Sequence, residues 1–381
     1  MTQKRIKLPA GVVAFSNGNT DLYEQFADYF NHYRAANKLF NAEGKALEYF
    51  TVDAEGKEIT FAEKEARLSA ALAEEISRVA QVKNVANLPL VTWASNPNIS
   101  WAAFAVVNQL IDAILPSVLV DSIGMYTEIK VVGWGETAAF DVKPRDLFYV
   151  SAAGRSMGQA ERVKQFNGQV VINPEMHEIT VGVSLYRLLA GAESLADFAA
   201  RAVRSVEAQV TVDAYSAFAT AMAALPTTDA NARLRIVGWS QDSFLELAEK
   251  VTAWNGGAQA ALVGTQRALQ NVLPDDANYR YFLTDEYATL GYMKNAFGYN
   301  AYRLPQVANW ATEFAVRLDN TKLWIVSPTS QKLVKLVLEG TTLANTTAPY
   351  QNANLTQNMT LMKAWKAGIA TNALAAEIDL S

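Results

Sequence analysis

Few residues in this chain have side chains suited to catalysis or metal binding. The only histidines are His32 and His177, and there is no cysteine. The stretch PEMHEIT around His177 lacks the second histidine that a zinc-binding H-E-x-x-H helix requires, which favours an ordinary residue on a strand surface. Without cysteine, thiol nucleophiles, disulfides and thiolate metal sites are excluded, which suits a reducing compartment. We therefore predict no catalytic residue, no metal ligand and no cofactor-binding residue.

Two strand-to-helix turns could present backbone N–H groups to an anion. They lie in ALVGTQRAL (261–269) and IVSPTSQKL (325–333). Neither turn is a glycine-rich loop with a lysine, the pattern that cradles phosphates. The sequence therefore favours ordinary helix capping over phosphate binding at both turns.

Two acidic pairs and two tryptophans that follow glycine complete the set of candidates. Asp275–Asp276 and Asp285–Glu286 lie in or beside a proline-bounded turn, where solvated carboxylates are favoured over a general acid and base. Trp134 and Trp239 occur in GWGETAAF and GWSQDSF, which favours packing or anchoring at an interface, with a sugar-binding platform as the alternative. None of these patterns predicts a particular reaction.

The composition describes a chain that can fold around a large core. It has 381 residues, of which 50% are hydrophobic, a net charge of −5 and a pI near 5.3. An acidic balance with no run of Lys and Arg argues against a protein that binds nucleic acid by neutralising phosphates. The start, MTQKRIKLPAGVVAF, has too short an apolar run for a signal peptide, and we expect an extended arm there.

The most apolar segment, WAAFAVVNQLIDAILPSVLV (101–120), is long enough to enter a membrane. It carries Asn108, Gln109, Asp112 and Pro116, which are costly in lipid and ordinary in a packed helix. We therefore expect a soluble protein with no membrane partner.

Apolar residues recur at three-and-four spacing in several segments, which predicts amphipathic helices. The predicted helices cover residues 21–40, 61–83, 101–115 and 193–225. The last would extend about 45–50 Å, long enough to act as a spine. A glycine-punctuated segment at 41–60 predicts a short hairpin, and prolines among residues 87–100 mark the end of an N-terminal region.

The segment from Thr127 to Leu185 alternates in polarity instead of following a helical period. TEIKVVGW and ETAAFDV run outward, SAAGRSMGQAERVKQFNG forms a polar tip, and QVVINPEMHEITVGVSL returns. This order predicts a long two-stranded projection. Because the projection has little apolar material of its own, it needs another surface to lie on, and a neighbouring subunit is the candidate.

The pattern of residues 230–340 predicts a compact α/β domain. LRIVGW predicts a strand, Ser240 a helix cap and QDSFLELAEKVTAW a helix. TKLWIVSPTSQKLVKLVLEG (321–340) repeats the order of strand, turn and helix. The tail is polar and strand-like with Gly368 as a break, and we expect it to return to the spine helix as an antiparallel partner.

The order of these pieces resembles the major capsid protein of tailed phages, which has the Hong Kong ninety-seven fold. The resemblance rests on the extended hairpin, the strand HEITVGVSL, the helix SLADFAARAVRSVEAQVTVDAYSAFATAMAAL, the segments ALVGTQRALQNVLP and LWIVSPTSQKLVKL, and the closing MTLMKAWKAGIATNALAAE. It covers the chain from about residue 90 to the end. It implies an α+β capsid fold with an N-terminal helical arm, an E-loop hairpin, a P-domain with a spine helix and antiparallel strands, and an α/β A-domain.

The resemblance also implies where these parts lie along the chain. The implied boundaries are 1–90 for the N-terminal arm or helical region, 91–130 for the first part of the P-domain, 131–175 for the E-loop, 176–232 for the P-domain with the spine helix, 233–340 for the A-domain, and 341–381 for the closing β segment of the P-domain.

The function implied by the resemblance is structural, so the chain is not expected to be an enzyme. Copies would self-assemble into hexamers and pentamers that form an icosahedral head shell, with portal and scaffolding or decoration proteins as further partners. The shell would enclose double-stranded DNA without sequence-specific binding, and the chain would belong to the virion after assembly in the host cytoplasm. Two alternatives stay open, an encapsulin-like nanocompartment shell and an α/β enzyme that binds a small ligand at 236–340.

Some relatives join an E-loop lysine to an asparagine of a neighbouring P-domain. The matching residue types here are Lys164 and Asn352, Asn354 or Asn358. The reaction needs a lysine that has lost its proton beside a carboxylate, and composition alone does not indicate such an environment. We therefore expect shells without covalent links. Shell size and cleavage of the N-terminal region are left open.

Overall fold

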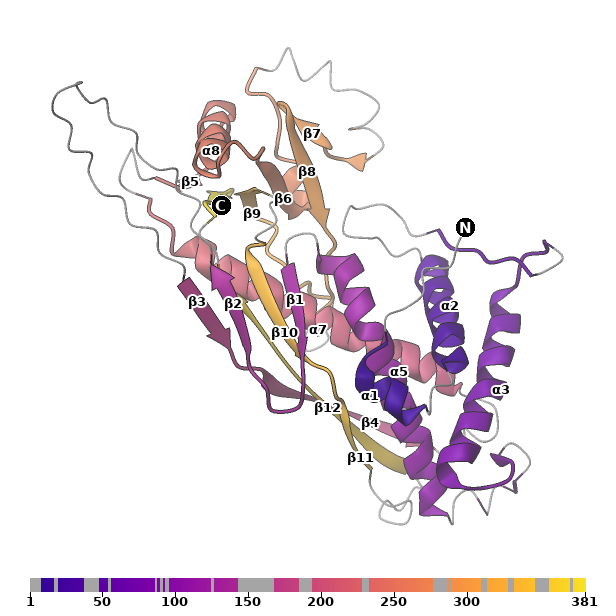
Figure 1. Cartoon of the computed structure of the whole chain (residues 1–381). Helices are drawn as coiled ribbons and strands as arrows, with labels where there is room; N and C mark the ends of the chain where they lie inside the picture. Colours follow the sequence, from indigo (N-terminus) through magenta and orange to yellow (C-terminus); the bar gives the residue numbers. More distant parts are fainter. Residues whose placement is uncertain are drawn as a thin grey trace, which may run out of the picture.

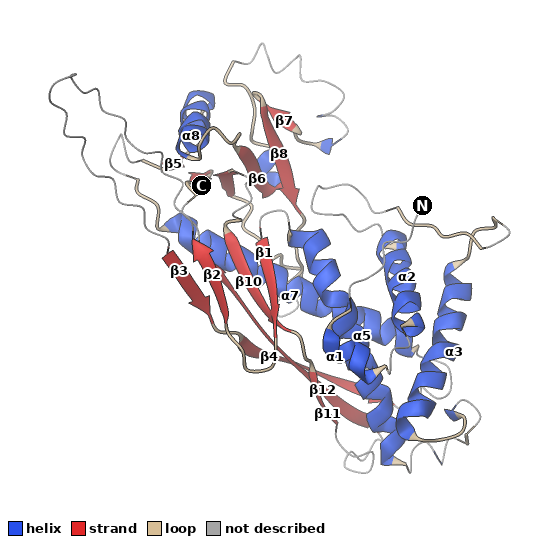
Figure 2. Ribbon diagram, in the orientation of Figure 1, coloured by secondary structure: helices blue, strands red, loops and turns tan. Residues whose placement is uncertain are grey.

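The computed structural model of the chain combines two β-sheets, a two-stranded ribbon and a set of long helices (Figures 1 and 2). The structure describes residues 8–16, 20–37, 48–53, 56–85, 88–89, 92, 96–124, 127–142, 168–184, 194–227, 233–276, 287, 290–309, 314–327, 332–346, 356–370 and 373–381.

A five-stranded sheet forms the elongated part of the molecule. Its strands are β1 (Thr127–Val132), β4 (Glu175–Ser184), β10 (Val334–Glu339), β11 (Leu343–Thr346) and β12 (Thr356–Ile369). The long strand β12 pairs antiparallel with β10 and β11 along one edge and with β4 along the other, while β1 pairs with β10 in parallel. β12 therefore organises the whole sheet.

Two helices, α5 (Pro97–Ile123) and α7 (Leu195–Ala223), cover one face of this sheet. The N-terminal helices pack on these two and are α1 (Ala10–Phe15), α2 (Asp21–Ala36) and α3 (Phe61–Ala80). Apolar side chains from all five helices share one core with strands β10 and β12, so the N-terminal helices belong to the main body of the fold. Among the described helices, only α5 is long and apolar enough to span a membrane, and most of it is buried in this fold.

A six-stranded sheet forms a second unit, which lies against the C-terminal part of α7. Its strands are β5 (Arg235–Val237), β6 (Ala261–Thr265), β7 (Asn295–Ala296), β8 (Tyr299–Leu304), β9 (Lys322–Val326) and β13 (Ala376–Asp379), in the spatial order β5-β13-β9-β6-β8-β7. One face packs against α8 (Gln241–Trp254) and α9 (Gln266–Leu269) around a core of its own. On the other face, Trp324 joins the main core beneath α7.

The predicted helices are confirmed, but the one expected at 101–115 is longer than predicted, because α5 runs from Pro97 to Ile123 and continues past Pro116. The spine helix expected at 193–225 is α7, whose first turn is capped by the Ser194 hydroxyl accepting from the Asp197 N–H, and which ends shortly before Pro226. α3 begins with a capping box between Thr60 and Glu63, and its left-handed C-cap is Gln81. The expected hairpin at 41–60 reduces, among the described residues, to a single bridge between Val52 and Glu58.

The helix expected after the second strand of the α/β segment is wrong, because residues 334–339 form strand β10. All six residues of β10 are buried, and a short apolar run buried on both faces has no period that distinguishes strand from helix. Gly368 is not a break either. It pairs with Lys335 inside β12, and a Cβ at Gly368 would lie 3.1 Å from Ile172 Cδ1.

The strands expected at the base of the projection also pair differently from the prediction. Only β2 (Ala138–Val142) and β3 (Gly168–Ile172) pair with each other, while β1 and β4 belong to the five-stranded sheet. The predicted polar tip lies outside the described residues. In the tail, β12 packs against α7 as expected, but β13 leaves this region and joins the six-stranded sheet between β5 and β9. The domain boundaries themselves stay a prediction.

Candidate assembly elements and family comparison

The two histidines have packing roles in the structure. His177 on β4 stacks on Trp365 of β12, with ring centroids 3.9 Å apart and an angle of 8° between the planes. His32 meets the ring of Phe61 edge-on at 5.4 Å, and burial, followed by the nearby Lys64 ammonium, lowers its pKa below the usual value. In the described part of the chain, no three His, Asp or Glu side chains gather in a way that could hold a metal ion.

Two of the candidate residues, Thr265 and Asp275, serve as helix caps. The Thr265 hydroxyl accepts from the Ala268 N–H at 3.3 Å, which confirms capping at the first strand-to-helix turn. Ser240 stands at the N-cap of α8 as expected, but its side chain makes no capping bond; Asp275 Oδ2 accepts from the Gln241 N–H at 3.0 Å instead. This capping role of Asp275 was not predicted. Asp285–Glu286 lies outside the described residues.

The two glycine-flanked tryptophans have different environments. The Trp239 Nε1–H donates to the Leu273 carbonyl at 2.8 Å, and its ring packs near Phe244 and Phe297 in the core of the six-stranded unit. Trp134 lies on the turn between β1 and β2 and is 56% exposed. Trp239 is therefore a packing residue of the core. Trp134 is exposed and remains a candidate for anchoring at an interface.

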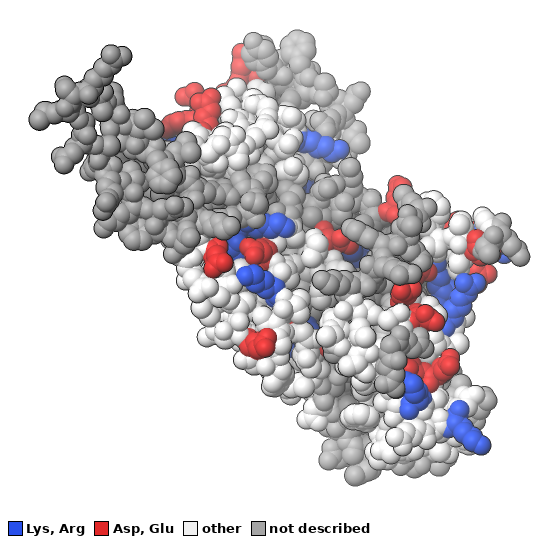
Figure 3. Space-filling view, viewed as in Figure 1, with Lys and Arg blue, Asp and Glu red and all other residues white. Residues whose placement is uncertain are grey.

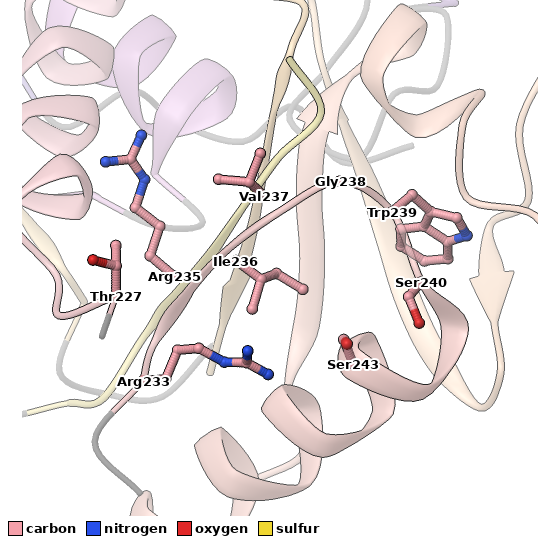
Figure 4. Close-up of a pocket in the computed structure, with 9 residues that line it drawn as sticks. All are labelled: Thr227, Arg233, Arg235, Ile236, Val237, Gly238, Trp239, Ser240 and Ser243. Atoms are coloured by element: carbon pink, nitrogen blue, oxygen red, sulfur yellow. The ribbon is translucent and has the colours of Figure 1, made fainter. Parts of the chain in front are cut away.

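An open hollow of about 250 Å³ lies beside β5 and the start of α8 (Figure 4). Its described lining is Thr227, Arg233, Arg235, Ile236, Val237, Gly238, Trp239, Ser240 and Ser243, so no carboxylate, histidine or lysine faces it from these residues. The Arg235 side chain is bound to Glu377 at 3.0 Å and to Asp379 at 2.9 Å. The described lining therefore offers hydroxyl groups, from Thr227, Ser240 and Ser243, but no carboxylate, histidine or lysine that could activate one of them or act as a general acid or base.

Two cations and two carboxylates tie β5, β9 and β13 together beside this hollow. Burial alone would raise the pKa of Asp379, but hydrogen bonds from Lys322, Ser381 and Arg235 outweigh burial and hold that pKa well below its usual value. Glu377, which is 1% exposed, also accepts from the Trp324 Nε1–H at 3.1 Å. The network joins three neighbouring strands through their side chains.

We expect the stabilising effect of Asp379 to depend on pH. Because its pKa is lower in the folded than in the unfolded chain, Asp379 stabilises the fold above about pH 4, and this contribution is lost as the pH falls. Asp379→Asn should therefore unfold at lower urea concentration than the parent at pH 7, with the difference shrinking in acid. Asp242→Asn, on the exposed face of α8, is the control. A difference that stays constant from neutral to acidic pH would contradict this explanation.

The spine helix α7 carries a buried ionic network that fixes the N-terminal helices. Arg34 of α2 is 2% exposed and lies 3.9 Å from Glu207 of α7 and 3.5 Å from Asp121 of α5. Glu207 is also paired with Arg204 at 2.6 Å. The buried charge of Arg34 is compensated by these two carboxylates, so the contacts specify how α2 docks on α5 and the spine helix.

A second buried ionic group links α5 to the sheet. Asp112 of α5 accepts from Lys363 Nζ of β12 at 2.5 Å and from the Thr342 N–H at 2.8 Å. All three residues are buried. Asp112 was one of the polar residues that favoured a packed helix over a membrane span. Its charge is compensated by Lys363 inside the protein.

Comparison with known proteins identifies a family. The family model described as "SPbeta prophage-derived putative capsid protein YonB" matches residues 37–374. The chain belongs to this family. It is a capsid protein with a structural role in the virion, as the sequence predicted. The match includes α3, which the sequence resemblance did not cover, but it begins after α1 and α2.

Solved phage capsids are among the similar structures. The mature capsid of bacteriophage PhiM1 aligns with 67% of this chain and 85% of its own, at 12% identity and a TM-score of 0.43. The capsid of the native GTA particle aligns with 68% of this chain and 89% of its own, at 13% identity and a TM-score of 0.44. No curated protein matches the sequence. Because both TM-scores are low, the assignment of this capsid protein rests on the family model.

Proposed function

We propose that this capsid protein self-assembles into hexamers and pentamers that close into an icosahedral head shell. The family match over residues 37–374 carries the proposal. Heterologous contacts between identical copies generate closed rings, and many modest contacts add up to a stable shell through multivalency. The candidate contact elements are the E-loop, the spine helix and the A-domain of the predicted domain scheme.

The proposed role is structural and not enzymatic. The hollow beside β5 supports this view, because its described lining offers no carboxylate, histidine or lysine to activate its hydroxyl groups. We further propose portal and scaffolding or decoration proteins as partners, and double-stranded DNA as the cargo. A net charge of −5 fits a shell wall that does not cling to the DNA.

Particle size tests the assembly proposal directly. Multi-angle light scattering of the purified chain is expected to show particles in the megadalton range, far above the 41.6 kDa subunit. Nuclease-treated particles from infected or induced cells should retain DNA, whereas an encapsulin-like shell would retain protein cargo. A chain that stays monomeric across ordinary salt and protein concentrations would contradict the proposal.

We also expect the shell to contain no covalent links between subunits. Of the four residues considered for such a link, only Asn358, which is exposed on β12, lies within the described residues. Mature particles boiled in denaturing detergent should therefore run as one band near 41.6 kDa, or as one shorter band if the N-terminal region is removed. A ladder of dimers to hexamers that survives boiling would show that Lys164 or another lysine is reactive.

A further inference from the structure

The ribbon β2–β3 packs on the face of the five-stranded sheet that lies opposite the helices. Side chains alternate along β10, because successive residues of a strand point to opposite faces. Val334, Leu336 and Leu338 enter the main core, whereas Val337 joins a separate small cluster. The other members of that cluster come from the ribbon and are Ala138, Phe140 and Ile172. The ribbon therefore has its own apolar contact with the sheet beneath it.

Phe140 is the centre of this contact, and it lies between two lysines. The side chain is 1% exposed, with Lys130 Nζ 4.4 Å and Lys335 Nζ 5.8 Å from the ring centroid. Ammonium groups at these distances are attracted to the face of an aromatic ring. Lys130 also donates to the Ala139 carbonyl of the ribbon at 2.6 Å, and Lys335 is paired with Glu128 at 2.5 Å.

Two further contacts fix the base of the ribbon, where β2 begins and β3 ends. Glu339 of β10 is 3% exposed and accepts at 2.7 Å from the N–H of Gly135, in the turn that leads into β2. At the same end of the ribbon, Ile172 is the partner of Ala138 and lies over Gly368 of β12, where a Cβ would come within 3.1 Å of Ile172 Cδ1. The ribbon is thus fixed on the sheet by apolar, cation–π and hydrogen-bonding contacts together.

We propose that Phe140, packed beside Lys130 and Lys335, is a positioning residue that sets the direction of the ribbon β2–β3 relative to the five-stranded sheet. The importance of this direction for assembly rests on the proposed function. An arm whose base is ordered before subunits meet loses less conformational entropy on association than an arm whose base is free to swing. The lysine-flanked ring therefore prepares the subunit for assembly.

The direction of the ribbon can be measured without assembly. The chain has no cysteine, so Gln169→Cys on β3 and Ala70→Cys on the exposed side of α3 give two specific spin-label sites. Labelled subunits are diluted with excess unlabelled subunits, so that electron–electron distances arise within one chain. We expect a single narrow distance in the otherwise unchanged protein, a broad distribution in Phe140→Leu and in Lys335→Met, and a narrow one in Phe140→Trp. A distribution in Phe140→Leu as narrow as in the parent would overturn the proposal.

Phe244→Leu is the matched control, because it makes the same change at a fully buried ring in the six-stranded unit. It should lower the thermal stability without broadening the distance. Shell formation by Phe140→Leu, followed by light scattering, should be slower by about tenfold, since the arm is then ordered only on association. If the parent forms no shell while Phe140→Leu still broadens the distance, positioning is supported and the assembly proposal is the one that fails.

Discussion

Lys363→Met is expected to lower the free energy of unfolding of the subunit by about 3–5 kcal/mol, because it leaves the buried Asp112 carboxylate without its counter-charge. Lys363 and Asp112 are 3% and 2% exposed, and the two residues connect β12 to α5. The Thr342 N–H and hydroxyl still donate to the carboxylate in the variant, but neutral donors compensate a buried charge only in part. Urea unfolding of unassembled subunits, followed by circular dichroism, measures the loss.

Lys366→Met is the matched control for this prediction. Lys366 lies three residues further along β12 and is paired with Glu175, but both side chains are exposed, at 45% and 63%. Exposed pairs contribute about 0–1 kcal/mol, so the control should unfold close to the parent. Combining Lys363→Met with Asp112→Asn should restore part of the lost stability, because the amide oxygen keeps an acceptor for Thr342 without a charge. Equal effects of Lys363→Met and Lys366→Met would show that burial of the pair does not matter.

Phe218→Asp is expected to abolish cooperative folding. Phe218 of α7 is 8% exposed, and its ring meets Trp324 of β9 edge-on, with centroids 4.9 Å apart. A carboxylate at this position would be buried between the spine helix and the six-stranded sheet with no partner, at a cost of several kcal/mol. That cost is comparable to the whole stability of a typical domain, about 5–15 kcal/mol. The variant should lack a sigmoidal unfolding transition and should accumulate in the insoluble fraction.

Phe314→Asp applies the same substitution to a ring that is 99% exposed. The backbone there has a φ of 56°, a conformation that aspartate adopts more readily than phenylalanine. We expect this variant to be soluble and to melt at or slightly above the parent temperature. If Phe218→Asp remained soluble with a normal transition, the contact between α7 and β9 would contribute little to the fold.

The sequence predicts well those elements whose signals are local. α7 could be placed because its apolar period continues between a serine cap and Pro226. The strand β10 could not, because its type depends on burial by the main core on one face and by the ribbon on the other. Gly368 illustrates the same limit, since a glycine reads as a break until Ile172 is seen lying over it. A sequence period reports which side of an element is apolar, but it does not report how many neighbours cover it.

The same holds for the candidate assembly elements. Their order along the chain could be predicted from the sequence, but their contacts could not. The resemblance to phage capsid proteins came from the order of elements, and the family match confirms it. The contacts that hold those elements were invisible in the sequence. Asp112 could be recognised as a polar residue in an apolar helix, but its partner Lys363 lies 251 positions away. The pairing of Phe140 with Lys130 and Lys335 likewise becomes visible only when β1 and β10 are placed side by side.

The position of β13 has a consequence for the synthesis of the subunit. β13 is the only described strand that pairs with β5, and it separates β5 from β9, yet it follows every other described strand in sequence. On the ribosome, β5 and β9 therefore emerge and wait with open edges until residues 376–379 have been translated. Folding of the six-stranded sheet depends on contacts distant in sequence, which form late. A nascent chain thus completes this unit only after β13 has been made, which delays association through this sheet with other copies until that point of translation.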